Sequence, residues 1–364
     1  MAALKIALVS SANSIHTARW ANAMAARGHS VTVFACAGHM PQNEDMYLKG
    51  VNLVALKYGA PLGYYLNARE LKKLINAGGF NVVNVHYASG YGTLGRRAKL
   101  KGALLNVWGS DVYEFPYQSS FNMRTVKKNL AYYKLLASTS NCMARQAQKL
   151  VDRQFEITPF GVDTSRFRPV DGVKQEGKFT FGTVKTLSPR YGITDSVIAF
   201  IKVYKRLIEE GETELASSLY YEIYGRGEQK DAIRTLIDDN GMSDRIKLCG
   251  FVENGKLPEI YNRFDVACYA SVSESFGVAA VEAMACGVPV CATDADGFVE
   301  VIEDGVSGLI SPRGEPLALA ENMYKLLMDG ALRKSFGAAG VERVKKFYEW
   351  NDNVSSMEAI YNRL

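Results

Sequence analysis

The sequence predicts an α/β protein built from two domains, each with a parallel β-sheet. Short apolar segments alternate with segments of helical period, which is typical of βαβ units. The alternation stops between Pro159 and Gly177, where proline, glycine and charge replace the periodicity, and it restarts afterwards. The 364 residues are too many for one ordinary core. They suit two domains of roughly 150–200 residues each.

The first half is expected to hold five strands. They cover residues 4–10, 29–36, 81–87, 103–109 and 134–139. After the first of them, a helix is expected from Ser14 to about Arg27, where Gly28 ends it.

The second half repeats the pattern with another five expected strands. They cover residues 178–184, 218–225, 245–251, 265–270 and 288–293. The chain is expected to be helical from about Leu317, and its last stretch is amphipathic. The predicted boundaries are an N-terminal domain over 1–170, a C-terminal domain over 171–346, and a helix over 347–364 that packs back on the first domain.

In open α/β sheets, ligands bind at the carboxyl ends of the strands. We therefore expect the two sheets to face each other across a cleft, and the strand-end loops to carry the chemistry.

Composition excludes several classes of protein. Apolar residues make up 48% and charged residues 22%, as in globular chains. No apolar run approaches the roughly 18 residues of a membrane span, and the N-terminal segment is typical of a core strand rather than a secretion signal. The six cysteines form no CxxC pair, so buried free thiols in the cytoplasm are expected instead of disulfides or zinc.

Charge is divided unevenly along the chain. Residues 1–170 hold 21 Lys and Arg against 8 Asp and Glu, whereas residues 171–364 hold 22 against 30. Three basic clusters, at 69–73, 96–101 and 124–128, lie on expected helices and suit an acidic lipid surface at about 1 kcal/mol per cation. A solvated basic face is the alternative. Nucleic acid is not expected, because no binding motif accompanies the charge.

The strongest pattern lies between residues 270 and 293. A strand ends, a loop with Glu274 follows, and an apolar helix runs from about Gly277 to Gly287 with Glu282 in its middle. A buried carboxylate needs a partner, and the hydroxyls of a sugar or ribose suit it. The free amides expected at the helix start suit a phosphate; they belong to Phe276, Gly277 and Val278. The alternative is a core helix in which Glu282 pairs with a buried base and Glu274 is solvated.

This pattern resembles the E-x7-E motif of the retaining family-4 glycosyltransferases, which have the GT-B fold. The flanking residues 275–277 and 283–290 resemble the family too, as does TPFGVDTSRFRP before the second domain. The resemblance covers nearly the whole chain. It implies that Glu274 contacts hydroxyls of the donor sugar, that Glu282 holds the ribose, and that Lys185 and Arg190 neutralise the diphosphate. The order of these two cations is the reverse of the family's usual order.

The resemblance also assigns residues to the nucleotide base and to the donor sugar. Gly225, Arg226, Phe251 and Val252 match the segments that line the base. The sequence around Gly225 is not a GxGxxG fingerprint, so it does not support NAD binding. His86 matches a histidine near the donor sugar, although alone it would more often be structural.

Fewer signals mark the acceptor side. Residues 10–20 follow the first strand as the family's glycine-rich loop does, but they lack the paired glycines. The candidates there are Asn13, His16 and Asp111. Asp111 could equally cap a helix, and Trp108 stands where many relatives have histidine.

The implied reaction moves a hexose or N-acetylhexosamine from a nucleotide sugar, with UDP favoured and GDP open, to a lipid-linked glycan or another hydroxyl. The resemblance implies retention of configuration, no cofactor and no metal. ATDADG, residues 292–297, is expected to be a turn rather than a metal site. The enzyme is expected to be cytoplasmic, and peripheral at the inner membrane face. A sugar-nucleotide epimerase on the same fold and a non-catalytic sugar-binding relative are the alternatives.

Overall fold

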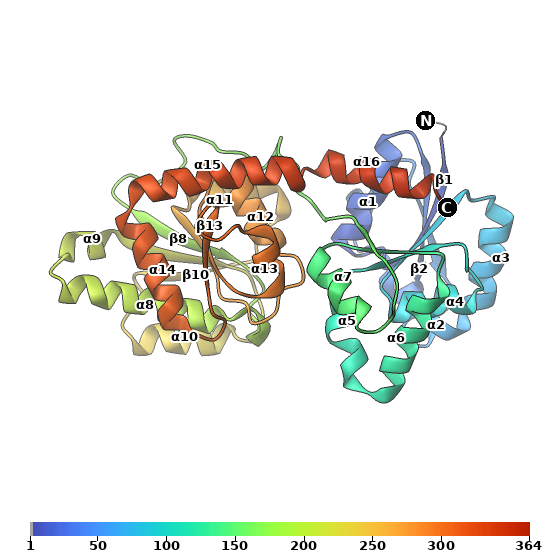
Figure 1. The fold of residues 1–364 in the computed structure, drawn as a ribbon, viewed down its shortest axis with the longest axis horizontal. Helices are drawn as coiled ribbons and strands as arrows, with labels where there is room; N and C mark the ends of the chain where they lie inside the picture. Colours follow the sequence, from blue (N-terminus) through green and yellow to red (C-terminus); the bar gives the residue numbers. More distant parts are fainter. Residues whose placement is uncertain (1–2) are drawn as a thin grey trace. The chain divides into compact units, whose positions relative to one another are not determined.

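The computed structural model describes residues 3–364 and divides the chain into two compact units (Figure 1). The first unit comprises the chain up to Phe160 together with Asn351–Leu364, and the second comprises Gly161–Trp350. Residues 1–2, at the start of the predicted N-terminal domain, lie outside the described residues.

The first unit is built on a seven-stranded sheet in the order β3-β2-β1-β4-β5-β6-β7. Every strand pair in it is parallel. The strands are β1 (Lys5–Val9), β2 (Ser30–Cys36), β3 (Asn52–Leu56), β4 (Val82–His86), β5 (Leu104–Val107), β6 (Leu135–Ser138) and β7 (Glu156–Ile157). The strand order reverses between β1 and β4, which is the topological switch point of a Rossmann-like sheet.

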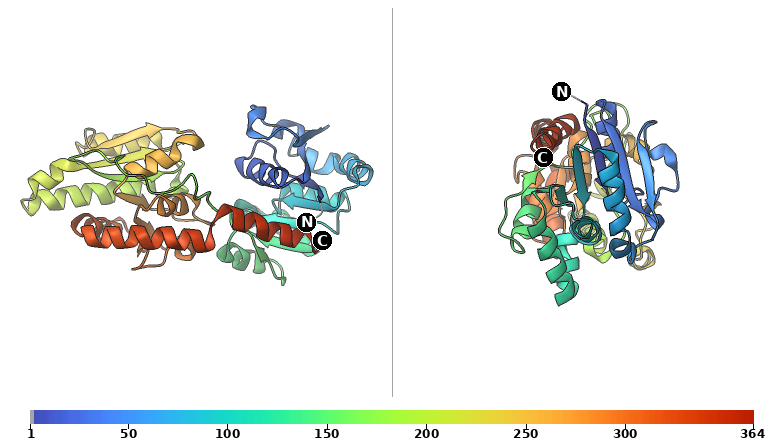
Figure 2. Two further views of the ribbon diagram at one scale, coloured as in Figure 1. Left: turned by 90° about the horizontal axis from the view of Figure 1, so that it is seen from above. Right: turned by 90° about the vertical axis from the view of Figure 1, so that its right-hand side faces the viewer.

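Helices cover both faces of this sheet (Figure 2). They are α1 (Ile15–Ala26), α2 (Gly63–Leu66), α3 (Ala68–Gly78), α4 (Gly90–Arg97), α5 (Ser110–Tyr113), α6 (Ser120–Tyr132), α7 (Asn141–Gln148) and α16 (Trp350–Tyr361). One apolar core joins α3, α4, α6 and α7 to the face of the sheet that carries Val9, Val85 and Leu105.

The C-terminal helix α16 is held to the first unit by polar contacts as well as apolar ones. The Tyr361 hydroxyl lies 2.7 Å from the Asn84 amide nitrogen on β4. Glu358 pairs with His29 at 2.8 Å and with Arg27. Burial would raise the pKa of Glu358, but the hydrogen bonds from His29 and Arg27 hold it below its ordinary value. This charged contact fixes which side of α16 faces the sheet.

The second unit repeats the topology with six parallel strands in the order β10-β9-β8-β11-β12-β13. The strands are β8 (Phe179–Val184), β9 (Leu219–Tyr224), β10 (Ile246–Gly250), β11 (Val266–Tyr269), β12 (Val290–Thr293) and β13 (Gly308–Ser311). The order reverses between β8 and β11. The second unit therefore has its own switch point.

Two groups of helices cover opposite faces of the second sheet. The helices of this unit are α8 (Ile193–Glu209), α9 (Thr213–Ser218), α10 (Lys230–Asp239), α11 (Leu257–Arg263), α12 (Val278–Ala285), α13 (Asp296–Val301), α14 (Pro316–Met328) and α15 (Gly330–Phe347). Helices α8, α10 and α14 share a core with Val266 and Cys268 of β11. Tyr269, on the other face of the same strand, contacts α12 and α13 instead. Together the two sheets confirm the predicted fold of two parallel-sheet, Rossmann-like domains.

The unit boundary falls ten residues before the expected end of the first domain at residue 170. The reason is hydrogen bonding by the segment that follows Phe160. The Val162 amide donates to the Tyr348 carbonyl at 2.8 Å, and the Val162 carbonyl accepts from Trp350 at 3.0 Å. These bonds tie the start of the expected linker to the end of α15, so the segment belongs to the second unit.

All ten predicted strands are present, and three further strands were missed. The missed strands are β3, β7 and β13. β3 is an edge strand with little buried surface, and β7 is two residues long. Neither gives the apolar run that marks a central parallel strand.

Candidate functional site

The switch point of the second sheet brings together two charged residues that lie far apart in the sequence. Lys185 directly follows β8, and Glu274 lies in the loop after β11, the neighbouring strand. The Lys185 Nζ lies 2.5 Å from a Glu274 carboxylate oxygen, and both side chains are about nine-tenths buried. The Lys185 ammonium also lies 4.6 Å from the ring centre of Tyr191. A cation and an anion are thus held, with little water around them, where ligands bind in such sheets.

Helix α12 confirms the predicted buried segment. Its residues from Ala279 to Ala285 are all buried, and Gly277 caps its start with φ +95°, a conformation that favours glycine. At the other end, the amides of Gly287 and Val288 donate to the carbonyls of Met284 and Ala283, as in a Schellman motif. The helix start therefore lies at the carboxyl edge of the sheet, as expected.

Glu282 is buried on α12 with 8% of its surface exposed. The Tyr261 hydroxyl donates to its carboxylate at 2.9 Å. Burial, together with this carboxylate, raises the pKa of Tyr261 well above its ordinary value. The phenol therefore remains a donor at neutral pH, and it orients the Glu282 carboxylate.

A pocket of about 470 Å³ lies beside these residues within the second unit. It brings together seven of the residues that the sequence assigned to the donor. They are Lys185, Gly225, Arg226, Phe251, Val252, Val278 and Glu282. Sequence reasoning missed Tyr191, Tyr224 and Tyr261, which also line it; each lies close to a predicted residue in the chain or contacts one.

Gly225 lines this pocket where two strand-end loops meet. Its amide donates to the Gly250 carbonyl at 2.7 Å, and a Cβ there would lie 1.8 Å from the Lys185 carbonyl oxygen. Only glycine allows this close approach. The segment after β9 is thereby packed against the one after β8.

Arg226 and Phe251 form a flat, exposed pair at the pocket. The Arg226 guanidinium lies 4.1 Å from the ring centre of Phe251, and that side chain is 61% exposed. A planar cation over an aromatic ring gives a stacking surface. The geometry suits the flat base of a nucleotide.

Arg190 and Phe276, which were also predicted to bind the donor, do not line this pocket. Arg190 lies in the 3-10 turn Pro189–Tyr191, and its Nε donates to the Ser273 carbonyl at 3.2 Å. Phe276 is 2% exposed and contacts the ring of Tyr348 edge-on, with 5.6 Å between ring centres. Phe276 thus anchors the loop, whereas the neighbouring Glu274 faces Lys185.

The switch point of the first sheet has a different character. The Ser10 hydroxyl, after β1, lies 3.1 Å from Nδ1 of His86 at the end of β4. The His86 ring lies 4.3 Å from Trp108. His16 stacks on Phe160 at 3.8 Å, and its Nδ1 is buried without a hydrogen-bond partner. Burial lowers the pKa of His86 to about 3 and that of His16 to about 4. Both rings are therefore neutral at pH 7.

Asp111 organises the backbone around the first switch point. Its carboxylate accepts from the amides of Ala88 at 2.7 Å, Trp108 at 3.1 Å and Gly109 at 2.9 Å. Burial raises its pKa despite these bonds. Asp111 joins the loops after β4 and β5, and it lies within α5 rather than at the N-cap position that Gly109 occupies.

A second pocket, of about 500 Å³, lies at the same edge of the first sheet. Asn13 lines it, and the backbone N–H of Asn13 donates to the His39 carbonyl at 3.0 Å. The other lining residues are polar or aromatic: Ser11, Ser14, His39, Tyr64, Tyr87, Ser89, Gly90, Tyr91, Ser110, Glu114, Phe115 and Gln118. His16, His86 and Asp111 do not line it. Hydroxyls, amides and rings of this kind suit a sugar better than a diphosphate.

Two features are absent from residues 3–364. No helix there is long and apolar enough to cross a membrane. No group of three or more His, Cys, Asp or Glu side chains is arranged to hold a metal ion.

Comparison with known proteins gives matches in both units. A family model described as "Glycosyl transferases group 1" matches residues 166–343, and one described as "Glycosyl transferase 4-like" matches residues 5–140. The phosphatidyl-myo-inositol mannosyltransferase of Mycobacterium leprae is 25% identical over 95% of this chain and 91% of its own length.

Solved structures share the whole fold. Sucrose-phosphate synthase from Thermosynechococcus elongatus matches with a TM-score of 0.83 and 19% identity, over 99% of this chain and 98% of its own. HepE of Anabaena, solved in complex with UDP-glucose, matches with a TM-score of 0.80 and 16% identity, over 99% and 100%.

The two Rossmann-like units and the two family matches define a glycosyltransferase. More particularly, its fold is the GT-B fold of two parallel-sheet, Rossmann-like domains.

Proposed function

We propose that this protein is a retaining, metal-independent glycosyltransferase that moves a hexose or N-acetylhexosamine from a UDP-sugar to an acceptor hydroxyl. One observation carries the proposal. The second unit gathers Lys185, Arg226, Phe251 and Glu282 around a single pocket, with Glu274 paired to Lys185 at its edge. Lys185 suits a phosphate, Arg226 and Phe251 together suit a base, and the two carboxylates suit hydroxyls: Glu282 those of a ribose and Glu274 those of a sugar.

The donor would lie with its base against Arg226 and Phe251 and its ribose hydroxyls on Glu282. Its diphosphate would compete with Glu274 for Lys185, which now lies 2.5 Å from that carboxylate. Glu274, released from the ion pair, would accept hydrogen bonds from the sugar. Arg190 is near enough to the same loop to add a second positive charge.

In the transfer step, the bond from the anomeric carbon to the β-phosphate oxygen breaks and a bond to the acceptor oxygen forms on the same face. The acceptor proton passes to the departing phosphate oxygen. Lys185, Arg190 and the start of α12 would stabilise the charge that develops on the diphosphate, which is electrostatic catalysis. This route uses no protein carboxylate as a nucleophile.

The acceptor side belongs to the first unit in this proposal. The polar and aromatic pocket around Asn13 would hold the acceptor sugar. The neutral His86 and His16 rings would support that edge of the sheet.

A lipid-linked glycan suits the surface of the first unit. Exposed Leu62 and Leu66, at 68% and 54%, lie on or beside α2, which contacts α3 and α4. These helices carry Arg69, Lys72 and Arg97, all exposed. Apolar side chains among cations are typical of a surface that rests on anionic lipid. We therefore propose a peripheral contact with the cytoplasmic membrane face.

Thermal shift with a series of UDP- and GDP-sugars tests the donor assignment. One donor class should raise the melting temperature, because a ligand that binds only the folded state stabilises it. Glu282→Ala should lose most of that shift, since hydrogen bonds to a charged group contribute about 1.5–3 kcal/mol each. Glu321→Ala, at a side chain that is 72% exposed on α14, is the matched control. An equal shift in all three proteins would exclude Glu282 from the site.

Product analysis separates the transferase from the alternatives. A transferase releases UDP and extends an added acceptor. An epimerase would return an isomerised nucleotide sugar without any acceptor, and a non-catalytic relative would bind the donor without turnover. No specific observation favours either alternative.

A further inference from the structure

Four consecutive carbonyls of the loop that carries Glu274, those of residues 271–274, accept hydrogen bonds from other segments. The Ser271 carbonyl accepts from the Thr293 hydroxyl at 2.6 Å, and the Val272 carbonyl accepts from Arg313 at 3.1 Å. The Ser273 carbonyl accepts from Arg190 at 3.2 Å, and the Glu274 carbonyl accepts from the Gly297 amide at 2.9 Å. Four donors from four segments therefore define the path of one short loop.

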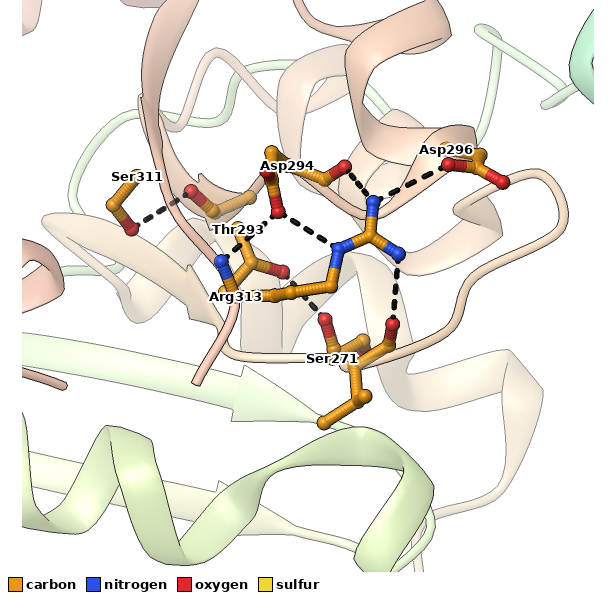
Figure 3. A network of polar contacts seen from close by, with 8 residues as sticks. Ser271, Thr293, Asp294, Asp296, Ser311 and Arg313 are labelled. Carbon is orange, nitrogen blue, oxygen red and sulfur yellow. Dashed lines mark hydrogen bonds and ion pairs between the residues drawn. The ribbon is translucent and has the colours of Figure 1, made fainter. Parts of the chain in front are cut away.

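Arg313 is the donor that joins most of these segments. It follows β13, and its Nε lies 2.8 Å from the Asp294 carboxylate in the turn after β12. A second guanidinium nitrogen contacts Asp296 at 3.2 Å and the Asp294 carbonyl, and a third reaches Val272 in the loop after β11. Figure 3 shows the guanidinium of Arg313 lying between Asp294 and Asp296. One side chain thus links the ends of three neighbouring strands.

The planar guanidinium is suited to this position because it offers several donors in a fixed arrangement. The two aspartates of the ATDADG segment are paired with it. This pairing gives both carboxylates of the segment a partner within the protein. Asp296 also starts α13, where Gly297 packs so closely that a Cβ would lie 2.6 Å from the Phe276 amide nitrogen. The Arg313 cluster, meaning Arg313 with Asp294 and Asp296, is therefore rigidly connected to the Glu274 loop.

We propose that Arg313 is a positioning residue for sugar transfer: it holds the Glu274 loop so that the carboxylate meets the donor sugar at the correct place. This inference rests on the proposed function, in which Glu274 contacts that sugar. Arg313 itself does not line the nucleotide pocket. Its loss should therefore change the chemical step and leave the binding of UDP in place.

Arg313→Ala should lower kcat about 10- to 100-fold, because a shift of about 1 Å in a reacting group costs that much. The Kd for UDP should change less than about 3-fold. Arg313→Lys keeps the charge but not the fixed arrangement of donors, so it should recover only part of the rate. Arg206→Ala is the matched control: Arg206 also pairs with two carboxylates and has a similar exposure, 39% against 36%, but it lies on α8.

Hydrogen exchange on the full chain gives a readout that does not depend on turnover. Arg313→Ala should speed exchange at the amides of residues 271–277, and Arg206→Ala should not. Unchanged exchange there, or an unchanged kcat, would overturn the proposal. An equal loss of UDP affinity and of kcat would also overturn it, because that outcome indicates general damage to the unit. If the unaltered enzyme transfers no sugar, the proposed function fails, and the exchange experiment still decides whether Arg313 holds the loop.

Discussion

The two switch points of this molecule have the same topology and opposite chemistry. In the second unit, the residues after the two central strands are Lys185 and the Glu274 loop, which form an almost buried ion pair. In the first unit, the corresponding positions carry Ser10 and His86, joined at 3.1 Å and packed against Trp108. We call the edge of the second unit the charged edge, after its ion pair, and that of the first unit the neutral edge, after its uncharged histidine rings beside aromatic ones.

Under the proposed function, this difference divides the work of a transfer reaction between two copies of one fold. A diphosphate needs fixed positive charge, which the charged edge would provide. An acceptor sugar needs hydrogen-bond partners and apolar ring faces, which the neutral edge would provide. Topology decides where each ligand lies, whereas the side chains decide which ligand it is.

The largest expected effect comes from removing the cation of the charged edge. Lys185→Met should lower kcat about 100- to 1,000-fold, as expected when a group that stabilises developing charge is lost. Lys202→Met, exposed on α8, should leave the rate unchanged. Steady-state kinetics with excess donor measure both.

Lys185→Met also leaves the Glu274 carboxylate without its ion pair, which can destabilise the unit. The double variant Lys185→Met with Glu274→Gln removes that unpaired charge. Its melting temperature should rise toward the original value, while its rate stays low. Recovery of the rate in the double variant would show that Lys185 acts only on folding.

The buried histidines of the neutral edge should make the folding stability of the protein depend on pH. His86 and His16 have pKa values lowered by burial to about 3 and about 4 in the folded state. The unfolded chain therefore binds more protons below pH 6.5, and stability falls as pH decreases through this range. The expected loss between pH 7.5 and pH 5 is about 2 kcal/mol for each histidine.

Chemical denaturation at these two pH values measures that loss. His16→Gln should reduce the difference in the free energy of unfolding between the two pH values, even where it also changes the stability at pH 7.5. A difference that stays the same would mean that His16 is not buried as a neutral ring. The two switch points would then no longer differ in charge.

The smallest expected effect concerns the basic surface of the first unit. Lys72→Glu with Lys73→Glu, on exposed positions of α3, should weaken binding to vesicles that contain phosphatidylserine. Each cation near such a surface contributes about 1 kcal/mol. Lys202→Glu with Lys205→Glu, on the second unit, is the matched control. Cosedimentation measures the bound fraction, and equal binding to neutral and anionic vesicles would contradict the proposed membrane contact.

The sequence by itself determined the two sheets, and it predicted seven of the residues that line the pocket of the second unit. Apolar strands that alternate with helices leave few topologies, and parallel strands place their following loops at one edge. Glu282 stood out because the helix between Gly277 and Gly287 is apolar on nearly every side, and Glu274 because its spacing from Glu282 resembles the E-x7-E motif. A carboxylate in such a helix has to be explained by a partner.

Only the tertiary structure decided which groups meet across strands. The Lys185–Glu274 pair spans 89 residues, and the contact between Arg313 and Val272 spans 41. Neither contact leaves a local pattern, because it depends on the order of strands in the sheet. The structure also placed Asp111 among three backbone amides and His86 in a fully buried position. Residue type predicts what a side chain can do, but only packing decides which atoms it reaches and how much water surrounds it.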